Sequence, residues 1–183
     1  MPLSRYLKIY PCRDRPGSSL LYSTKKGALI RLSLAQMEAL KREALTDVER
    51  ATLTRLEIWT DNPDAERESM AAIVSRVNRR RDKFKVIVVL NLDCNLYKCP
   101  AFLGWPELSV GSLTDGIGDY SVSHNLDFWK TDECLECAYL PLCFGGCWLL
   151  PLLEHGSINR VDCRKEFYDS VLEGFILQDL RYR

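Results

Sequence analysis

The sequence predicts an α+β protein with an N-terminal part of short strands and helices and a C-terminal part rich in cysteines and loops. Three observations support this fold class. Apolar residues alternate in short runs near the N-terminus, as in half-buried strands, and two helices with clear start signals follow them. Five of the eight cysteines lie between residues 134 and 163, where neither helical nor strand periodicity is pronounced. A last amphipathic helix is expected at about 164–180.

Three strands are expected first, at residues 5–11, 19–24 and 27–32. The first alternates apolar and polar residues, and the turn Pro16-Gly17 separates it from the second. The run Lys25-Lys26-Gly27 breaks the second strand from the third. Short strands joined by such turns predict a small sheet.

Two helices follow, and each begins with a capping box. The pattern S-x-x-Q at Ser33 opens a helix to about residue 44, and T-x-x-E at Thr46 opens one to about residue 56. A short returning strand is expected at 58–60. Together these elements predict a winged-helix-like module over 1–60. A small α+β cap without a ligand is the alternative interpretation.

Residues 61–96 are expected to form a helix and then a buried strand. Asn62-Pro63-Asp64 gives an N-cap, a proline in the first turn and an acid near the positive end of the helix dipole. Residues 84–92 are a nearly continuous apolar run, which is typical of strands buried on both faces. The helix should bury one face, formed by Met70, Ile73, Val74 and Val77.

The cysteines between 134 and 163 have the spacing C-x2-C-x5-C-x3-C followed by one more thiol. Gly145 and Gly146 separate two of them and can adopt the positive φ of a tight turn. Soft thiolates at short spacing are the ligands of iron–sulfur clusters and zinc. The sequence therefore predicts a metal centre with ligands drawn from Cys134, Cys137, Cys143, Cys147 and Cys163.

Three chemistries compete for these thiols. Disulfides belong to oxidising compartments, and the N-terminus has no segment typical of a signal peptide. Zinc is the second alternative, since C-x2-C pairs are common in zinc sites. A single tetrahedral zinc closes with four ligands, however, and a fifth thiol implies a second centre, for which Cys99 is available. The odd number favours iron–sulfur chemistry.

The run from Cys134 to Cys163 resembles the SPASM domain, the auxiliary-cluster module of many peptide-modifying radical SAM enzymes. The likeness covers about 97–183 and includes an upstream Cys99 followed by Gly111. The chain has Gly116 where that family has a further cysteine, so the second cluster would be incomplete. The resemblance implies an outer 4Fe–4S cluster held by Cys134, Cys137, Cys143 and Cys163, and an inner one that would use Cys147 and Cys99.

The strand at 84–92 and the following Asp93-Cys94-Asn95-Leu96 look like the start of a radical SAM core and its C-x3-C-x2-C loop. Only Cys94 of that loop is present, and the barrel itself is missing between Leu96 and Tyr97. The flanks are most similar to geopeptide-type radical SAM maturases. In such enzymes a winged-helix-like module binds the leader segment of a precursor peptide.

The resemblance implies an iron–sulfur protein related to enzymes that modify ribosomally synthesised peptides. One 4Fe–4S cluster is expected. S-adenosylmethionine would be used only if the missing core were supplied, so independent cleavage is not expected and no catalytic residue is predicted. Whether the chain is an enzyme stays open. The alternative function is a non-catalytic peptide-binding protein with a structural zinc or cluster site.

Charge is divided between the halves of the chain. Residues 1–90 carry 18 Lys and Arg against 11 Asp and Glu, and residues 91–183 carry 7 against 14. Such opposite signs favour docking of the halves or different partners for each. No basic tail with aromatics indicates nucleic acid, and no apolar run is long enough for a membrane. Eight cysteines without a signal segment predict a cytoplasmic protein.

Two smaller predictions concern the C-terminal half. The last helix is expected to bury a stripe made by Phe167, Val171 and Phe175, which recur at every fourth position. The two histidines, His124 and His155, are expected to be loop or surface residues and not metal ligands. Together with the cysteine-rich loops, the helix completes a module over 97–183.

Overall fold

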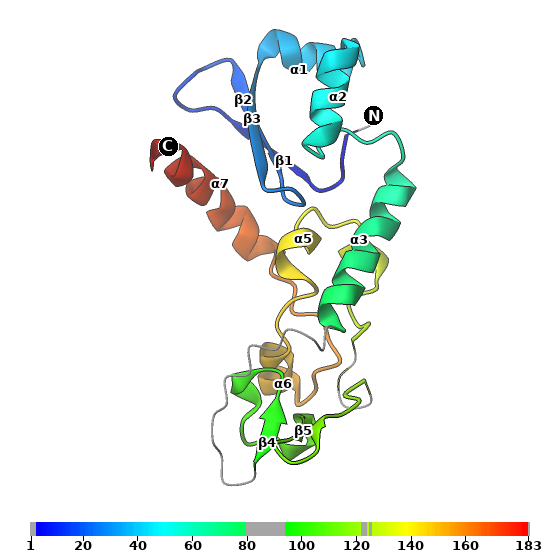
Figure 1. Ribbon diagram of the computed structural model, residues 1–183. Helices are drawn as coiled ribbons and strands as arrows, with labels where there is room; N and C mark the ends of the chain where they lie inside the picture. Colours follow the sequence, from blue (N-terminus) through cyan, green and yellow to red (C-terminus); the bar gives the residue numbers. More distant parts are fainter. Residues whose placement is uncertain (1–2, 80–93, 122–123, 125, 183) are drawn as a thin grey trace. The chain divides into compact units, whose positions relative to one another are not determined.

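A computed structural model describes residues 3–79, 94–121, 124 and 126–182 (Figure 1). The chain forms two compact units. The first combines residues 1–71, 132–144 and 164–183, and the second combines 72–131 and 145–163. The α+β class is confirmed. The predicted strand at 84–92 lies outside the described residues, and the division into modules 1–60, 61–96 and 97–183 stays a prediction.

The first unit contains the predicted small sheet, whose strands pair antiparallel in the order β1–β2–β3. Its strands are β1 (Leu7–Pro11), β2 (Ser18–Ser23) and β3 (Ala28–Ser33). Leu21 in the central strand lies opposite Ile9 on one side and Ile30 on the other. Because side chains alternate between the faces of a strand, each strand contributes to two different cores.

Both predicted capping boxes are present. Ser33 Oγ accepts from the Gln36 amide at 3.3 Å before α1 (Leu34–Lys41), and Gln36 Oε1 accepts from the Ser33 amide at 2.9 Å. Thr46 and Glu49 make the same reciprocal pair before α2 (Asp47–Arg55). The returning strand expected at 58–60 is reduced to one isolated bridge between Trp59 and Leu3.

The face of the sheet that meets α1 and α2 forms the aliphatic core of the first unit, called here the front face (Figure 1). Leu21, Leu40 and Ile58 are fully buried in it. Burial of one such side chain stabilises the fold by roughly 1.5–3 kcal/mol. The buried members of this core are Leu21, Met37, Leu40, Leu53, Ile58 and Trp59.

The opposite face, called here the back face, packs against the last helix, α7 (Lys165–Tyr182), and the loop before α5 (Leu140–Cys143). The stripe predicted for α7 is wrong. Phe167 and Phe175 are 51% and 63% exposed, whereas the neighbouring stripe of Leu172 and Ile176 is buried. The back-face core contains Tyr139, Leu172 and Ile176, with Tyr10, Tyr22, Leu29, Cys137, Leu142 and Tyr168 packed on it.

Helix α3 (Pro63–Asn78) begins as predicted, with Asn62 Oδ1 accepting from the Ala65 amide at 3.0 Å. Met70 and Val74 are buried on it at 2% and 0% exposure. Val77, expected on the same face, is 40% exposed.

The second unit contains a small antiparallel sheet in the order β4–β5–β6 and short helices. Phe102, Leu108 and Ile158 form one small core, and Val110, Tyr120 and Leu126 form another. None of the described helices has the length and apolar character needed to cross a membrane. The remaining elements are β4 (Asn95–Tyr97), η1 (Pro100–Phe102), η2 (Pro106–Leu108), β5 (Ser109–Ser112), β6 (Gly116–Ile117), α4 (Asp132–Leu135, in the first unit) and α6 (Leu149–His155).

Candidate functional site

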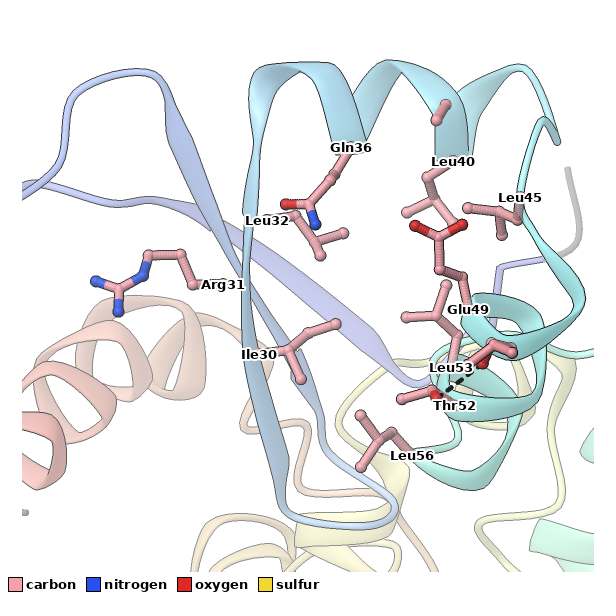
Figure 2. A pocket seen from close by; sticks show the side chains of 12 residues that line it. Ile30, Arg31, Leu32, Gln36, Leu40, Leu45, Glu49, Thr52, Leu53 and Leu56 are labelled. Carbon is pink, nitrogen blue, oxygen red and sulfur yellow. Dashed lines mark hydrogen bonds between the residues drawn. The ribbon is translucent and has the colours of Figure 1, made fainter.

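The front face of the first unit carries a pocket between β3, α1 and α2 (Figure 2). Its volume is about 310 Å³. Ile30 and Leu32 of β3 point toward the helices, whereas Arg31 between them points away (Figure 2). This alternation follows from the period of two in a strand. The pocket is lined by Ile30, Arg31, Leu32, Gln36, Ala39, Leu40, Leu45, Val48, Glu49, Thr52, Leu53 and Leu56.

Two polar lining side chains, Gln36 and Glu49, are used for helix capping, and the Thr52 hydroxyl donates to the Val48 carbonyl within α2. Glu49 accepts from the Thr46 hydroxyl at 2.7 Å and from its amide at 2.9 Å, and these hydrogen bonds lower the pKa of the Glu49 carboxyl. Gln36 is held by Ser33 in the same way. No cysteine, histidine or lysine is among the lining residues. The pocket is therefore suited to binding apolar groups and not to acid–base or nucleophilic chemistry.

One edge of the sheet runs beside the pocket. Within the described residues β3 pairs with β2 alone, so its other edge presents unpaired backbone groups. An exposed edge of this kind is a template for pairing with another strand. Arg31 on this strand is exposed. The edge and the pocket together form a groove, called here the β3 groove.

Three of the predicted metal ligands lie in the segment 132–144 of the first unit, called here the thiol loop. Cys134 lies in α4, and the Cys137 amide donates to the Cys134 carbonyl at 3.1 Å, which closes a tight turn between the two thiols. Cys143 ends α5, and Phe144 after it has a left-handed φ of 50°. One tight turn therefore separates Cys134 from Cys137, and the chain turns again directly after Cys143.

Part-buried hydrogen bonds from Thr24 and Tyr6 to backbone carbonyls of the thiol loop attach this loop to the sheet. Thr24 Oγ1, at 4% exposure, lies 2.5 Å from the Ala138 carbonyl and 3.0 Å from the Tyr6 carbonyl. The Tyr6 hydroxyl donates to the Leu135 carbonyl at 3.2 Å. Burial raises the pKa of Tyr6 to about 12, so this hydroxyl stays a donor at neutral pH. The loop is therefore part of the same unit as the N-terminal sheet.

Ionic contacts reinforce the attachment. Arg5 forms an ion pair with Glu136, which lies between Cys134 and Cys137, and lies 4.0 Å from Glu66 of α3. Glu66 is buried at 8% exposure and accepts from the Ser4 hydroxyl at 2.6 Å. Burying a carboxylate is unfavourable unless it is paired and hydrogen-bonded. These contacts satisfy it and fix the position of the loop.

Tyr139 is the main aromatic contact of the thiol loop. Its ring stacks on Tyr168 of α7 with the centroids 5.2 Å apart, and its hydroxyl donates to Asp169. Lys8 of β1 pairs with the same carboxylate at 2.9 Å. The hydrogen bonds from Tyr139 and Lys8 lower the pKa of Asp169. Burial, followed by the hydrogen bond to Asp169, raises the pKa of Tyr139.

The other predicted ligands belong to the second unit. Gly146, next to Cys147, lies against Asp162, next to Cys163: a Cβ on Gly146 would be 2.4 Å from the Asp162 carbonyl oxygen. Gly145 and Gly146 both have positive φ, 98° and 93°, as predicted. Gly146, which has no side chain, therefore lets the chain segments of Cys147 and Cys163 approach each other closely.

Cys99 packs beside the core of Phe102, Leu108 and Ile158, and Cys94 is exposed just before β4. All eight cysteines lie among the described residues, each as a thiol. Among those residues, no group of three or more His, Cys, Asp or Glu side chains is arranged to hold a metal ion. The convergence of Cys134, Cys137, Cys143 and Cys163 on one centre therefore stays a prediction.

Sequence reasoning missed an aromatic cluster in the second unit. His124, expected in a loop or at the surface, is fully buried, and its ring lies 5.1 Å from that of Trp148 and 5.7 Å from that of Tyr120. Lys98 Nζ lies 4.6 and 4.8 Å from the same two rings and donates to the Asn78 carbonyl. Burial lowers the pKa of Lys98 to about 8, and burial and Lys98 lower that of His124 to about 4. Only the local density of aromatic residues could have indicated this cluster.

Comparison with protein-family models, curated proteins and solved structures gives no match to this chain. The features of the described residues that bear on function are the β3 groove and the thiol loop.

Proposed function

We propose that this chain is a peptide-binding protein in which the β3 groove holds an extended segment of a partner peptide. The observation that carries the proposal is the open edge of β3 beside an apolar pocket lined by Ile30 and Leu32 of the same strand. A peptide that adds a strand to a sheet edge gains main-chain hydrogen bonds, and pockets for alternate side chains give specificity. The peptide would place alternate apolar side chains in the pocket.

Charge indicates the remaining side chains of the peptide. Residues 1–60 carry 11 Lys and Arg against 6 Asp and Glu. Arg31 is exposed on the groove strand and points away from the pocket (Figure 2). Side chains of an added strand that point to that side would meet this guanidinium, which binds carboxylates well. An acidic peptide with alternate apolar residues, such as a precursor peptide, fits both features.

The thiol loop suggests a second component of the function, a metal centre. The donor set fits a thiolate-bound metal, because soft thiolates at short, turn-rich spacing select iron–sulfur clusters or zinc. Cys134, Cys137, Cys143 and Cys163 would hold an outer 4Fe–4S cluster, with Cys147 and Cys99 as ligands of a second, incomplete one. Zinc is the alternative. A cluster would supply electron transfer, and either metal would supply folding free energy. The resemblance to radical SAM maturases with a SPASM domain supports iron; S-adenosylmethionine would need the missing core, and Cys94 alone cannot replace it.

Peptide binding can be tested with a fluorescein-labelled decapeptide in which leucine and glutamate alternate. Thr52 is an exposed residue that lines the pocket, so Thr52→Trp should fill it and weaken binding at least tenfold in fluorescence anisotropy. Thr54→Trp is the matched control, because Thr54 is exposed on the same helix but does not line the pocket. Equal affinities of the two variants, or no binding by the wild-type chain, would contradict the proposal.

The metal component needs a separate experiment. Anaerobic reconstitution followed by analysis of iron, sulfide and zinc should give about four irons and four sulfides per chain for one cluster. The content should fall in Cys137→Ser and stay unchanged in Cys12→Ser, because Cys12 is a buried residue outside the predicted ligand set. Stoichiometric zinc without sulfide would favour the zinc alternative. The absence of both metals would remove the metal component and leave the peptide groove.

A further inference from the structure

The front and back faces of sheet β1–β3 are built from neighbouring residues of the same strands. Leu21 and Ile30 pair across β2 and β3 and belong to the core that adjoins the groove. Tyr22 and Leu29, the next pair in register, pack on the back-face core with Cys137 and Tyr139. Because one layer of backbone separates the faces, a displacement of β2 or β3 on one side moves the packing surface on the other.

The turn between β2 and β3 connects the thiol loop to the walls of the β3 groove. Thr24, the first residue after β2, holds the Ala138 carbonyl of the thiol loop through its buried hydroxyl. Its neighbour Lys25 forms an ion pair with Glu57 at 3.7 Å, just beyond the end of α2. Helix α2 supplies Leu53 to the pocket, and β3 follows the turn directly. A single turn therefore joins the thiol loop to two walls of the β3 groove.

We infer that the position of the thiol loop controls the affinity of the β3 groove, so that ordering of the loop on the back face strengthens peptide binding on the front. This inference rests on the proposed function for its peptide and extends it with a means of regulation. By thermodynamic linkage the effect is reciprocal: a bound peptide also stabilises the ordered loop. Metal binding by the thiols of the loop is one event that would order it.

The test removes the hydroxyls that hold the thiol loop and substitutes no residue that lines the groove. Thr24→Val removes the hydroxyl that holds Ala138 and keeps the size of the side chain. Tyr6→Phe removes the hydroxyl that donates to the Leu135 carbonyl and keeps the ring. This variant provides the same test if Thr24→Val does not fold. Thr54→Val is the matched control, because Thr54 is exposed and its hydroxyl donates to the Arg50 carbonyl of its own helix at 2.9 Å.

The Kd for the leucine–glutamate decapeptide should rise about fivefold or more in Thr24→Val and in Tyr6→Phe, within the usual range of coupling between sites. It should not change in Thr54→Val. A second readout needs no peptide: amide hydrogen exchange should accelerate in residues 132–144 and also in β3 and at Leu53 and Leu56 of the groove.

The Kd and the amide exchange rates distinguish a failure of the proposed function from a failure of the coupling. If the wild-type chain does not bind the peptide but the variants still accelerate exchange in β3 and α2, the proposed function fails, and the coupling of the thiol loop to β3 and α2 stands without its effect on peptide affinity. If exchange accelerates in 132–144 alone, with β3, Leu53 and Leu56 at wild-type rates, the coupling is overturned, and the peptide proposal is unaffected. The coupling is also overturned, and the peptide proposal is again unaffected, if the Kd in Thr24→Val and Tyr6→Phe equals that of Thr54→Val.

Discussion

The front and back faces of the N-terminal sheet use the same three strands in different ways. The front face is aliphatic and leaves an apolar pocket open beside the edge of β3. The back face is rich in tyrosine and is closed by α7 and the thiol loop, with hydrogen bonds and ion pairs at its margin. An apolar surface with an open edge can accept a partner, whereas a surface closed by packed aromatic side chains with polar contacts at its margin fixes a segment of its own chain.

The largest expected effect concerns the closure of the back face by α7. Ile176→Ala should lower the free energy of unfolding by about 2–5 kcal/mol, because Ile176 is only 6% exposed in the back-face core. Phe175→Ala, at an adjacent residue that is 63% exposed, should change it by less than about 0.5 kcal/mol. Urea denaturation of both variants measures the difference. A larger loss for Phe175→Ala would mean that the originally predicted stripe is the buried one.

This pair of residues also illustrates what the sequence could and could not predict. Phe167, Val171 and Phe175 repeat every four residues, but Tyr168, Leu172 and Ile176 do so as well, one position later. Periodicity alone cannot choose between two adjacent apolar stripes, since the choice depends on the surface against which the helix packs. The same limit applies to Val77, which has the helical spacing of Met70 and Val74 but is 40% exposed.

Features that depend on neighbouring residues in the sequence could be predicted from the sequence alone. The capping boxes of Ser33 and Thr46, and the positive φ of Gly145 and Gly146, depend on residues close in sequence, and the structure confirms them. The β3 groove needed the pairing order of the strands, and the contact between Thr24 and the thiol loop joins residues 114 positions apart. No local pattern encodes such a contact. The metal ligands were predicted from spacing and resemblance, and they stay a prediction.

The second prediction concerns how the stability of the second unit depends on pH. His124 is buried and neutral in the folded chain, where its pKa is about 4, and about 6.5 is its ordinary value when unfolded. Between these values the unfolded chain binds a proton that the folded chain does not, so stability falls as pH is lowered. The loss approaches about 1.4 kcal/mol per pH unit within this window.

Urea midpoints at pH 7 and pH 5, read from residues of the second unit, measure the loss due to His124. His124→Phe keeps an aromatic ring among Phe102, Tyr120 and Trp148 and removes the titrating group. The variant should therefore lose clearly less stability between these pH values than the wild type, although Lys98 still carries its charge nearby. Equal losses would show that His124 is not the responsible group.

The smallest expected effect is at the margin of the back face. Tyr139→Phe removes the hydroxyl that donates to Asp169 and should lower the free energy of unfolding by about 1 kcal/mol. The pKa of Asp169 should then rise toward its ordinary value, since the hydrogen bond from Tyr139 is the main cause that lowers it. The stability contributed by Asp169 is present above its unfolded pKa and is lost as pH falls, so the variant should lose less stability on acidification. The pKa of Asp169 can be followed by carboxyl NMR, and an unchanged value would contradict this account.

The most direct test of the account is an NMR titration of the isotopically labelled chain with the leucine–glutamate decapeptide. The account predicts the largest shifts in the methyl groups of Ile30, Leu32 and Leu53, together with protection of the outer amides of β3. Smaller shifts should follow in the thiol loop on the opposite face of the sheet. Shifts that leave β3 and the pocket unchanged would contradict the assignment of this groove as the peptide-binding site.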